Sequence, residues 1–419
     1  MTHIPAACGI DFGTSNSTAA RSVGGQAELM PLESGKVTLP SVVFFNAEDD
    51  TTRFGRAGLT DYLAGYEGRL MRSLKSLLGS SLIDGQTEVN GRALPFRDLL
   101  RQFIGELKHR IDTHNGDAFE RVVLGRPVHF VDGDAAADKM AENTLADIAR
   151  SVGFRDISFQ YEPIAAAYHY ETTITREAFV LVADIGGGTS DFSLIRLSPE
   201  RARRAERKDD VLANGGVHIG GTDFDRQLNL AGVMPLLGYR GSLKSGREMP
   251  SSIFFTLATW HTINSAYTRQ SLAEQKALLL DSSETDKTAR LLKLLDTRAG
   301  HWLANEVEQA KIALSDASIA TLQLDALEDG LTQEIERELF EEASEALLDQ
   351  IAGTVTQLLI DAGVGADQVD TVLFTGGSSG IPRLRARIAA LLPQAQAVEC
   401  DLFGSIGAGL AVEAARRYG

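Results

Sequence analysis

The sequence predicts an α/β protein of two lobes, each a mixed sheet flanked by helices. Two observations predict this fold. The chain has 419 residues, more than the roughly 250 to 300 at which a single hydrophobic core stops growing. One pattern also occurs twice, at 9–17 and at 183–192: an apolar run, an aspartate, a glycine-rich turn and another β-rich run. A repeated strand, turn and strand indicates two similar sheets.

The first half of the chain reads as strands followed by alternating helices and strands. The strand-like runs are 6–10, 17–22, 41–45, 122–124 and 157–160, and the helical runs are 99–111, 135–152 and 163–170. Within 99–111 the apolar residues recur on one helical face: Leu99, Leu100, Phe103, Ile104, Leu107 and Ile111. This alternation indicates a sheet with helical crossovers.

The second half repeats this plan from Ala178. A meander through the second turn precedes a glycine turn at 218–221 and a helix from Thr222. Residues 230–305 are mostly helical, and we expect a helical subdomain inserted in lobe two. The remaining elements are a helix at 302–315, a strand at 321–324, a helix at 333–362, a strand at 369–375, a helix from Pro382 and a helix at 406–418. We expect residues 1–178 and 402–419 to form lobe one and 179–401 lobe two, with no C-terminal substrate-binding domain.

Both repeated turns have the composition of a phosphate-binding loop. Glycine adopts φ > 0 and lets backbone N–H groups approach an anion, while hydroxyls complete the site. Asp11 and Asp184 occupy equivalent turns. Either aspartate alone is typical of a turn residue that bonds its own backbone, and the duplication favours a site. Mg²⁺ keeps several waters and is held through carboxylates and phosphates, so we expect Asp11, Asp184 and Asp191 to hold it largely through water, with Glu162 as a further candidate.

Composition and charge exclude several classes of protein. Hydrophobic residues make up 43% of the chain, and no apolar run approaches the roughly 20 residues of a membrane helix. The net charge of −16 disfavours nucleic-acid binding and self-association, so we expect a monomer. The basic segment from Arg201 to Lys208 is predicted to be a solvated hairpin. Cys8 and Cys400 are too few for a disulfide framework or a zinc site. Residues 1–5 lack a basic leader, which predicts a cytoplasmic protein.

Five blocks of the chain together resemble the ATPase domain of DnaK-type (70-kDa heat-shock) chaperones, within the actin and sugar-kinase superfamily. They are GIDFGTSNS (9–17), EPIAAAY (162–168), DIGGGTSDF (184–192), GGTDFD (220–225) and TGGSSGIP (375–382). The segments GRPVHF (125–130) and ATWH (258–261) are similar to the shorter YegD-type relatives. The resemblance implies a two-lobed actin-like ATPase fold that binds ATP or ADP with magnesium.

The resemblance also implies roles for single residues on the phosphate side. Lys75 corresponds to the lysine that positions the attacking water, and Glu162 to the carboxylate beside that water. Asp184 and Thr189 complete the expected catalytic group. The expected phosphate ligands are Gly13, Thr14 and Ser15 from the first turn and Gly186, Gly187, Gly188 and Thr189 from the second.

On the nucleoside side, the implied ligands are Gly220, Gly221, Glu308, Lys311, Ser315, Gly376, Gly377, Ser378 and Asp401. The family has two arginines that sandwich the adenine, and this chain has Ile312 and Gly380 there. Loss of both stacking contacts, each worth about 0.5 to 2 kcal/mol, predicts weaker nucleotide binding and relaxed base preference. Pro127 corresponds to the switch proline of the family, whereas an ungapped count to its partner arginine reaches Ala135.

The expected function is slow Mg-dependent ATP hydrolysis that opens and closes the lobes and acts on a protein partner or client polypeptide. The inserted helices, with Phe254, Phe255, Leu257 and Trp260, either pack on the lobe or bind that partner.

A sugar or carboxylate kinase shares the phosphate loops but needs an acceptor pocket with a base. An actin-like filament protein is disfavoured by the insertion and the charge. A serine hydrolase elbow at 376–380 is excluded because no histidine follows His301.

Overall fold

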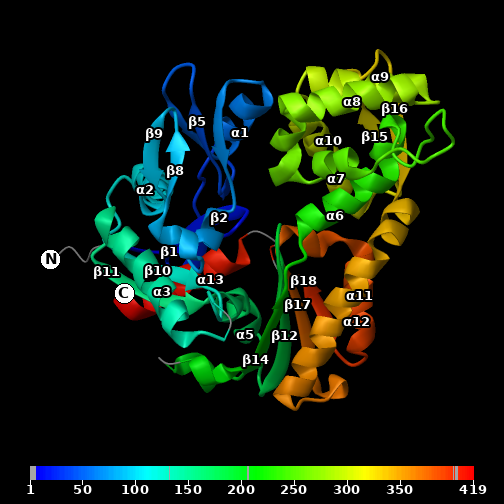
Figure 1. Ribbon diagram of the computed structural model, residues 1–419. Helices are drawn as coiled ribbons and strands as arrows, with labels where there is room; N and C mark the ends of the chain where they lie inside the picture. The colour runs from blue at the N-terminus through cyan, green and yellow to red at the C-terminus, as the bar shows by residue number, and fades with distance from the viewer. Residues whose placement is uncertain (1–5, 132, 205–206, 400, 402–403) are drawn as a thin grey trace. The chain divides into compact units, whose positions relative to one another are not determined.

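The computed structural model describes residues 6–131, 133–204, 207–399, 401 and 404–419 (Figure 1). Contacts divide the chain into two compact units. Unit 1 comprises Met1–Gly216, Val355–Ser379 and Ala389–Gly419, and unit 2 comprises Val217–Thr354 and Gly380–Ile388. The predicted lobes follow other boundaries and stay a prediction. Residues 1–5, Cys400 and residues 402–403, to which some predictions refer, lie outside the described part.

Unit 1 contains two sheets with equivalent strand orders (Figure 1). One has the order β11 (Asp156–Tyr161), β10 (Arg121–Arg126), β1 (Ala7–Asp11), β2 (Asn16–Val23), β3 (Gln26–Leu29), with β4 (Thr38–Pro40) also paired to β2. The other has the order β18 (Gln396–Glu399), β17 (Thr371–Thr375), β12 (Ala178–Ile185), β13 (Ser190–Leu197), β14 (Val211–Val217). In both, the hairpin strands are antiparallel and the two strands on the other side are parallel. The predicted class of mixed sheets flanked by helices is confirmed.

The first sheet is buried on both faces because its strands alternate between two hydrophobic cores. Val122 and Leu124 of β10 belong to one core, shared with α2 (Phe96–Asn115) and α3 (Ala135–Ser151). Val123 belongs to the other core, shared with α4 (Glu162–Ala166) and α13 (Ser405–Tyr418). Successive side chains of a strand point to opposite faces. Helices on both sides therefore hold the strand ends in place.

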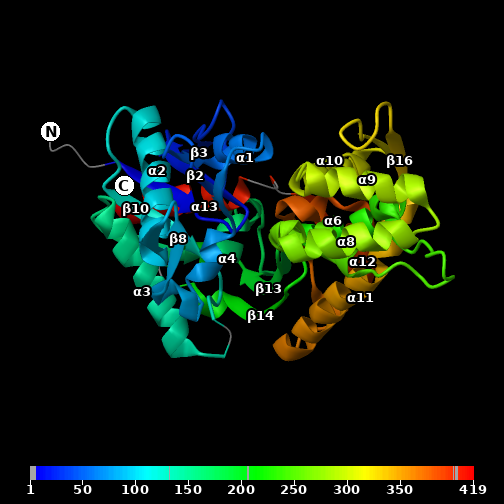
Figure 2. The ribbon, with the colours of Figure 1, turned by 45° about the horizontal axis from the view of Figure 1, so that its top comes forward.

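Helix α13 lies beside β2 and β3 (Figure 2). It also packs closely on β1 and α4, where glycines form the contacts. A Cβ at Gly9 of β1 would overlap the backbone of α13 at Ala411. A Cβ at Gly409 of α13 would overlap the carbonyl oxygen of Ala165 in α4. Backbones can approach this closely only where side chains are missing. The first and last segments of the described chain thus share one core.

The other small elements of unit 1 lie between β4 and α2 in the sequence. They are β5 (Val43–Asn46), β6 (Thr52–Phe54), α1 (Gly55–Leu63), β7 (Gly68–Met71), and the hairpin of β8 (Gln86–Val89) and β9 (Arg92–Pro95). Helix α5 (Tyr168–Glu171) follows α4. Of these, the sequence predicted the strand at β5 and, within the helical run 163–170, most of α5. The others are short or have no clear apolar period.

Unit 2 is mostly helical, and helices are present within 230–305 as predicted. That this range is an insertion in lobe two stays a prediction. Its elements are α6 (Gly221–Leu228), α7 (Ser252–Ala258), α8 (Arg269–Asp281), α9 (Thr285–Asp296), α10 (Gly300–Asp316), and the hairpin of β15 (Ile319–Gln323) and β16 (Thr332–Glu336). Helices α11 (Arg337–Ala362) and α12 (Pro382–Leu391) run across the unit boundaries. Phe254 and Leu257 are buried, Trp260 is partly buried and Phe255 is exposed, so packing accounts for two of the four apolar residues considered as a partner surface.

Two sequence expectations are wrong. The helix predicted from residue 333 begins at Arg337, because Thr332–Glu336 pairs with β15 and buries Ile335. The segment from Arg201 to Lys208 is not a solvated hairpin: Arg207 is 6% exposed. Its guanidinium donates to Glu171 at 2.6 and 3.1 Å and also to Asp210. Residues 205 and 206 of this segment lie outside the description.

Among the described helices, none combines the length and the apolar composition that a membrane crossing requires.

Candidate functional site

The first glycine-rich turn joins β1 to β2 and is held by Ser41. The Ser41 hydroxyl donates to the carbonyl of Gly13 at 2.6 Å, and the Ser41 amide donates to the carbonyl of Ser15 at 2.9 Å. A Cβ at Gly13 would overlap the carbonyl oxygen of Asn16, so this turn requires glycine. Asp11, the last residue of β1, is buried just before the turn. Thr14 lies between the two anchored carbonyls.

The second glycine-rich turn joins β12 to β13 in the equivalent position. The Gly186 amide donates to the Thr189 carbonyl at 2.9 Å and closes the turn. The Thr189 hydroxyl donates to Asp191 Oδ2 at 2.7 Å, and Asp191 pairs with Asp184 across the two strands. The Ser378 hydroxyl donates to the Gly186 carbonyl at 2.9 Å. Each turn therefore has a serine from a distant segment that fixes one of its glycine carbonyls.

The two turns meet within unit 1. A Cβ at Gly187 would overlap Ser15 Oγ, whereas a Cβ at Gly188 would have no atom within 4 Å. Gly376 follows β17 with φ 78°, and a Cβ there would lie 2.5 Å from Asp184 Oδ1. Only glycine combines this left-handed backbone with so close a neighbour. Gly377 begins the 3₁₀ turn that carries Ser378. The phosphate-side residues predicted from both turns are thus neighbours.

Lys75 and Glu162 form a buried ion pair beside these turns. Lys75 Nζ lies 2.5 Å from Glu162 Oε1, and their side chains are 12% and 11% exposed. Lys75 lies in the 3₁₀ turn Leu74–Leu77, and Glu162 is the first residue of α4, directly after β11. Gly79 follows the lysine turn, and a Cβ on it would lie 2.5 Å from the Phe130 carbonyl. The segment from Lys75 to Gly79 therefore packs against the segment that follows β10.

The carboxylates of Asp11, Glu162 and Asp184 are close enough to affect one another's charge. Burial raises the pKa of Asp11 to about 7, with Glu162 adding to the rise and Lys75 opposing it. Burial, Asp191, Glu162 and Asp11 together raise the pKa of Asp184 to about 8. Burial alone would lower the pKa of Lys75, but Glu162 and Asp11 raise it overall. Lys75 therefore stays a cation at neutral pH, and the aspartates lack sufficient positive charge around them.

This donor set fits a hydrated divalent cation that accompanies a polyphosphate. Among the described residues, no group of three or more His, Cys, Asp or Glu could hold a metal ion by itself. Mg²⁺ is commonly bound through one or two carboxylates, several waters and substrate phosphates. Asp11 and Asp184, with their raised pKa values, are the carboxylates whose repulsion a cation would relieve. The glycine turns supply backbone N–H groups for the phosphates.

The predicted nucleoside ligands are divided between the two units. Unit 2 contains Gly220, Gly221, Glu308, Lys311 and Ser315, and unit 1 contains Gly376, Gly377, Ser378 and Asp401. Glu308, Lys311 and Ser315 share one face of α10, since helical residues three, four and seven apart lie together. Lys311 Nζ lies 2.8 Å from Asp225 Oδ1 and donates to the Gly221 carbonyl at 3.2 Å. Lys311 thus braces the Gly220 and Gly221 turn at the start of α6. Ile312, the residue at one arginine position of the family, is 52% exposed.

Asp401 lies in unit 1, just before α13. Its backbone carbonyl accepts from the Ser405 amide at 3.2 Å, and a Cβ at Gly404 would overlap its carboxylate. The structure thus groups the predicted phosphate residues and Asp401 in unit 1 and the α6 and α10 residues in unit 2. Ser41 was missed by sequence reasoning, because a serine after a proline carries no pattern that predicts its two bonds to the first turn.

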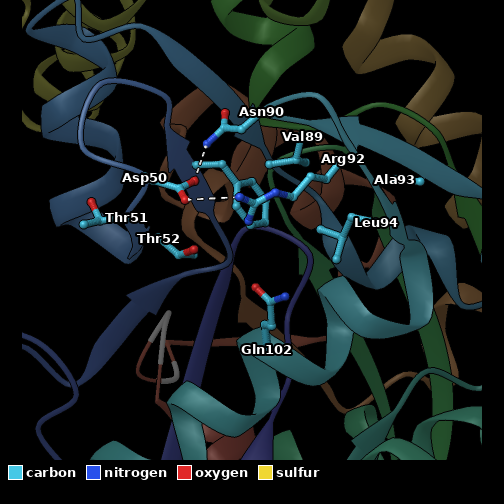
Figure 3. Close-up of a pocket in the computed structure, with 10 residues that line it drawn as sticks. Asp50, Thr51, Thr52, Val89, Asn90, Arg92, Ala93, Leu94 and Gln102 are labelled. Atoms are coloured by element: carbon cyan, nitrogen blue, oxygen red, sulfur yellow. Dashed lines mark hydrogen bonds and ion pairs between the residues drawn. The ribbon is translucent and has the colours of Figure 1, made fainter.

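A cavity of about 290 Å³ in unit 1 is lined by other residues (Figure 3). It lies between the turns beside β5 and β8, where the Asn90 amide donates to Asp50 Oδ1 at 3.2 Å and Arg92 lies 3.8 Å from Asp50. The side chains of Arg92 and Asp50 are 80% and 64% exposed. None of the predicted site residues lines this cavity, so we assign it no part in the candidate site.

Comparison with known proteins finds a matching family model and several relatives with the same name. A family model described as "Hsp70 protein" matches residues 7–231 and 282–417. The unmatched residues between these ranges fall within the predicted insertion at 230–305. The chain is similar to "Chaperone protein HscA" of Klebsiella pneumoniae, with 28% identity over 97% of this chain and 58% of that protein. The proteins of that name from Salmonella typhimurium and Citrobacter koseri are 28% and 27% identical, over 97% and 96% of this chain. The chain spans about 58% of the length of such relatives.

Proposed function

The chain belongs to the Hsp70 family, and from this premise we propose that it is an ATP-binding chaperone ATPase that hydrolyses ATP slowly. Membership of the family implies nucleotide binding. The family match favours this function over a small-molecule kinase or a filament protein. The finer likeness to YegD-type relatives stays a prediction.

The observation that carries the proposal is the Lys75 and Glu162 pair beside two glycine turns that touch. The pair joins Nζ to Oε1 at 2.5 Å, and Gly187 packs against Ser15. Phosphoryl transfer needs positioning and charge stabilisation more than covalent help from the protein. A fixed cation and N–H donors from two turns supply both.

The proposed reaction is attack of water on the γ phosphorus of ATP. A new bond forms between the water oxygen and phosphorus, and the bond from phosphorus to the bridging oxygen breaks, leaving ADP with the electron pair. The water proton ends on the phosphate product. Because Glu162 and Asp11 keep Lys75 protonated, Lys75 orients the water and stabilises phosphate charge and does not abstract a proton. Glu162 holds Lys75 in place, and Thr189 belongs to the facing turn.

Asp11, Asp184 and Asp191 would hold magnesium, largely through water. The ion supplies charge neutralisation for the phosphates when it is bound. The proposed nucleoside ligands are Gly220, Gly221, Glu308, Lys311, Ser315, Gly376, Gly377, Ser378 and Asp401. Since Ile312 and Gly380 replace stacking arginines, we expect micromolar or weaker affinity and relaxed base preference.

The wider role is proposed from the family alone. We propose a cytoplasmic monomer whose lobes, 1–178 with 402–419 and 179–401, open and close with the nucleotide. That movement would act on a client polypeptide or another protein partner, as the name "Chaperone protein HscA" suggests for the relatives. A difference in affinity for nucleotide between the two states is required for such coupling.

One experiment separates the candidate functions. The protein is incubated with ATP and magnesium alone, with candidate sugars and carboxylic acids, and with an unfolded polypeptide. We expect inorganic phosphate in every case, and ATP-sensitive retention of the polypeptide. Phosphorylated sugars or acids would favour the kinase, and sedimenting polymer the filament. For the site, Asp184→Asn should weaken Mg-ATP binding and hydrolysis. Unchanged binding and hydrolysis in this variant would overturn the assignment.

A further inference from the structure

Arg126 is a buried charged residue beside the proposed site, and no role has been assigned to it above. It is the last residue of β10, and it pairs in register with Tyr161, the last residue of β11. Its side chain is 9% exposed. Glu162 directly follows Tyr161, and a Cβ at Gly125 would lie 3.2 Å from the Glu162 side chain. The ends of β10 and β11 thus place Arg126 next to the turn that carries Glu162.

Two carboxylates of α3 hold the Arg126 guanidinium. It donates to Asp138 Oδ2 at 2.8 Å and to Glu142 Oε2, and also to the carbonyl of Val128 at 3.1 Å. Although burial opposes it, the bond from Arg126 keeps the pKa of Asp138 below its usual range. A planar guanidinium with several fixed donors suits such a site, which a lysine cannot reproduce.

Two aromatic rings complete the surroundings of Arg126. The guanidinium carbon lies 5.3 Å from the ring centres of both Tyr161 and Phe130. The Phe130 amide donates to Asp138 Oδ1 at 2.5 Å. The same carboxylate therefore binds both Arg126 and the Phe130 backbone, while cation–π contacts hold the two rings.

Phe130 connects this cluster to the lysine of the proposed site. Its carbonyl lies against Gly79, where a Cβ would be 2.5 Å away, and Gly79 comes four residues after Lys75. Contacts therefore run from the Lys75 segment through Phe130 to Arg126, and from Arg126 through Tyr161 to Glu162. Each partner of the buried ion pair therefore lies on a segment that is linked to the Arg126 guanidinium through one aromatic residue.

We propose that Arg126 is a positioning residue that fixes the Glu162 turn relative to the Lys75 segment through Asp138, Tyr161 and Phe130. Its kinetic consequence rests on the proposed function, whereas its effect on the Lys75 and Glu162 pair does not. Apart from Tyr161, the cluster belongs to residues 125–142, and it contains no expected nucleotide ligand. Arg126 therefore acts through the ion pair and touches no reacting atom.

The first test uses the nucleotide-free protein. The rate at which acetic anhydride acylates Lys75 is measured by peptide mass spectrometry in wild type, Arg126→Met and Arg121→Met. Arg121 is a matched control, because it lies on the same strand, pairs with Asp156 at 3.2 Å and is far along β10 from Glu162. We expect acylation of Lys75 to rise severalfold in Arg126→Met and to stay at the wild-type rate in Arg121→Met. Equal rates in folded Arg126→Met and wild type would overturn the proposal.

The second test measures single-turnover ATP hydrolysis and ATP affinity separately. In Arg126→Met we expect hydrolysis to fall about tenfold to a hundredfold, as displacements near 1 Å can cause, with affinity changed less than about twofold. In a Lys75→Met background the Arg126 change should have no further effect, because it acts through that lysine. Additive losses would indicate a separate role and overturn the proposal.

Two outcomes need separate treatment. If Arg126→Met does not fold, Arg126→Lys is compared with Arg121→Lys in both assays, and a selective effect at Arg126 is expected because lysine lacks the planar fork. If wild type neither binds nor hydrolyses ATP, the proposed function fails. The acylation rates still decide whether Arg126 holds the Lys75 and Glu162 pair.

Discussion

Gly187 and Gly188 are neighbours in the second turn but have different surroundings. A Cβ at Gly187 would overlap Ser15 Oγ of the first turn, whereas a Cβ at Gly188 meets nothing within 4 Å. We expect Gly187→Ala to lower the free energy of unfolding by about 0.5 to 1.5 kcal/mol, since the Ser15 hydroxyl must turn to another rotamer. Gly188→Ala should leave stability within about 0.5 kcal/mol. Thermal unfolding of the nucleotide-free variants checks this, and equal stabilities would show that the turns do not touch.

Asp184 is a source of instability in the nucleotide-free protein, and the effect depends on pH. Burial and the nearby Asp191 raise its pKa from the ordinary 3.8 to about 8. The folded state therefore binds a proton that the unfolded state releases between these values, so stability falls as pH rises through this window. Asp184→Asn removes this cost.

The expected result is a variant more stable than wild type by about 1 to 3 kcal/mol above pH 8, with the gain vanishing below pH 4. Urea unfolding without nucleotide or divalent cations, at a series of pH values, measures the gain. If Asp184→Asn were more stable than wild type by the same free energy at every pH, the difference could not come from titration of Asp184.

At the residue scale the sequence predicted which side chains gather but not what holds them. Duplication of the turns identified Asp11 and Asp184, because each turn has the same composition after an apolar strand. Ser41, Ser378 and Arg126 carry contacts that depend on tertiary packing. Ser378 lay in one of the five blocks and Arg126 in the segment GRPVHF (125–130), but neither motif predicted the contacts of these side chains. The roles assigned to the ligands stay predictions.

Among the elements, α13 has the closest packing contacts with the site helix α4. Gly409 allows the contact with the Ala165 carbonyl, three residues after Glu162. We expect Gly409→Ala to destabilise the protein by about 1 to 3 kcal/mol through overpacking. Gly353→Ala in α11 is the control, since its Cβ meets nothing within 4 Å and alanine stabilises an exposed helix by about 0.5 to 1 kcal/mol. Denaturant unfolding compares the two, and a stabilised Gly409→Ala would rule out the close contact.

Elements with a strong period could be predicted, and short polar ones could not. The helical face of Leu99 to Ile111 lies inside α2, and the strand at 122–124 lies inside β10. Residues 333–336 lack a period that separates a strand from a helix start, and only pairing with β15 decides it. The β6, β7, β8 and β9 strands are similarly defined by partners rather than by composition.

Across the whole molecule, a buried ion network joins segments that are far apart in the sequence. Arg207 binds Glu171 of α5 and Asp210, while Arg201 donates to Asp210 at 2.6 Å. We expect Arg207→Met to cost about 3 to 5 kcal/mol, because it removes the guanidinium that binds the buried Glu171 carboxylate and leaves Asp210 with Arg201 alone. The exposed Arg203→Met should change stability by less than about 0.5 kcal/mol. Chemical denaturation compares the stabilities of Arg207→Met and Arg203→Met. Similar stabilities would show that the Arg207 guanidinium is exposed to solvent.

The repeated sheet plan could be predicted from the two glycine turns, and the division into contact units could not. Both turns, with their hairpins, belong to unit 1, whereas the expected lobes separate them. Contacts among α4, α13 and β12 create this grouping, and such contacts leave no periodic signal. The predicted lobes are therefore best tested by nucleotide-dependent movement in solution.

Single-turnover release of inorganic phosphate from ATP and magnesium tests most directly whether this chain is an ATPase that works through Lys75. Lys108→Met is the matched control, because Lys108 is also a buried lysine, 2.6 Å from Asp112. We expect slow phosphate release by wild type and Lys108→Met, and a loss of about a hundredfold or more in Lys75→Met with ATP still bound. Phosphate release by Lys75→Met at the wild-type rate would contradict the role of Lys75, and no phosphate release by wild type would contradict the ATPase function.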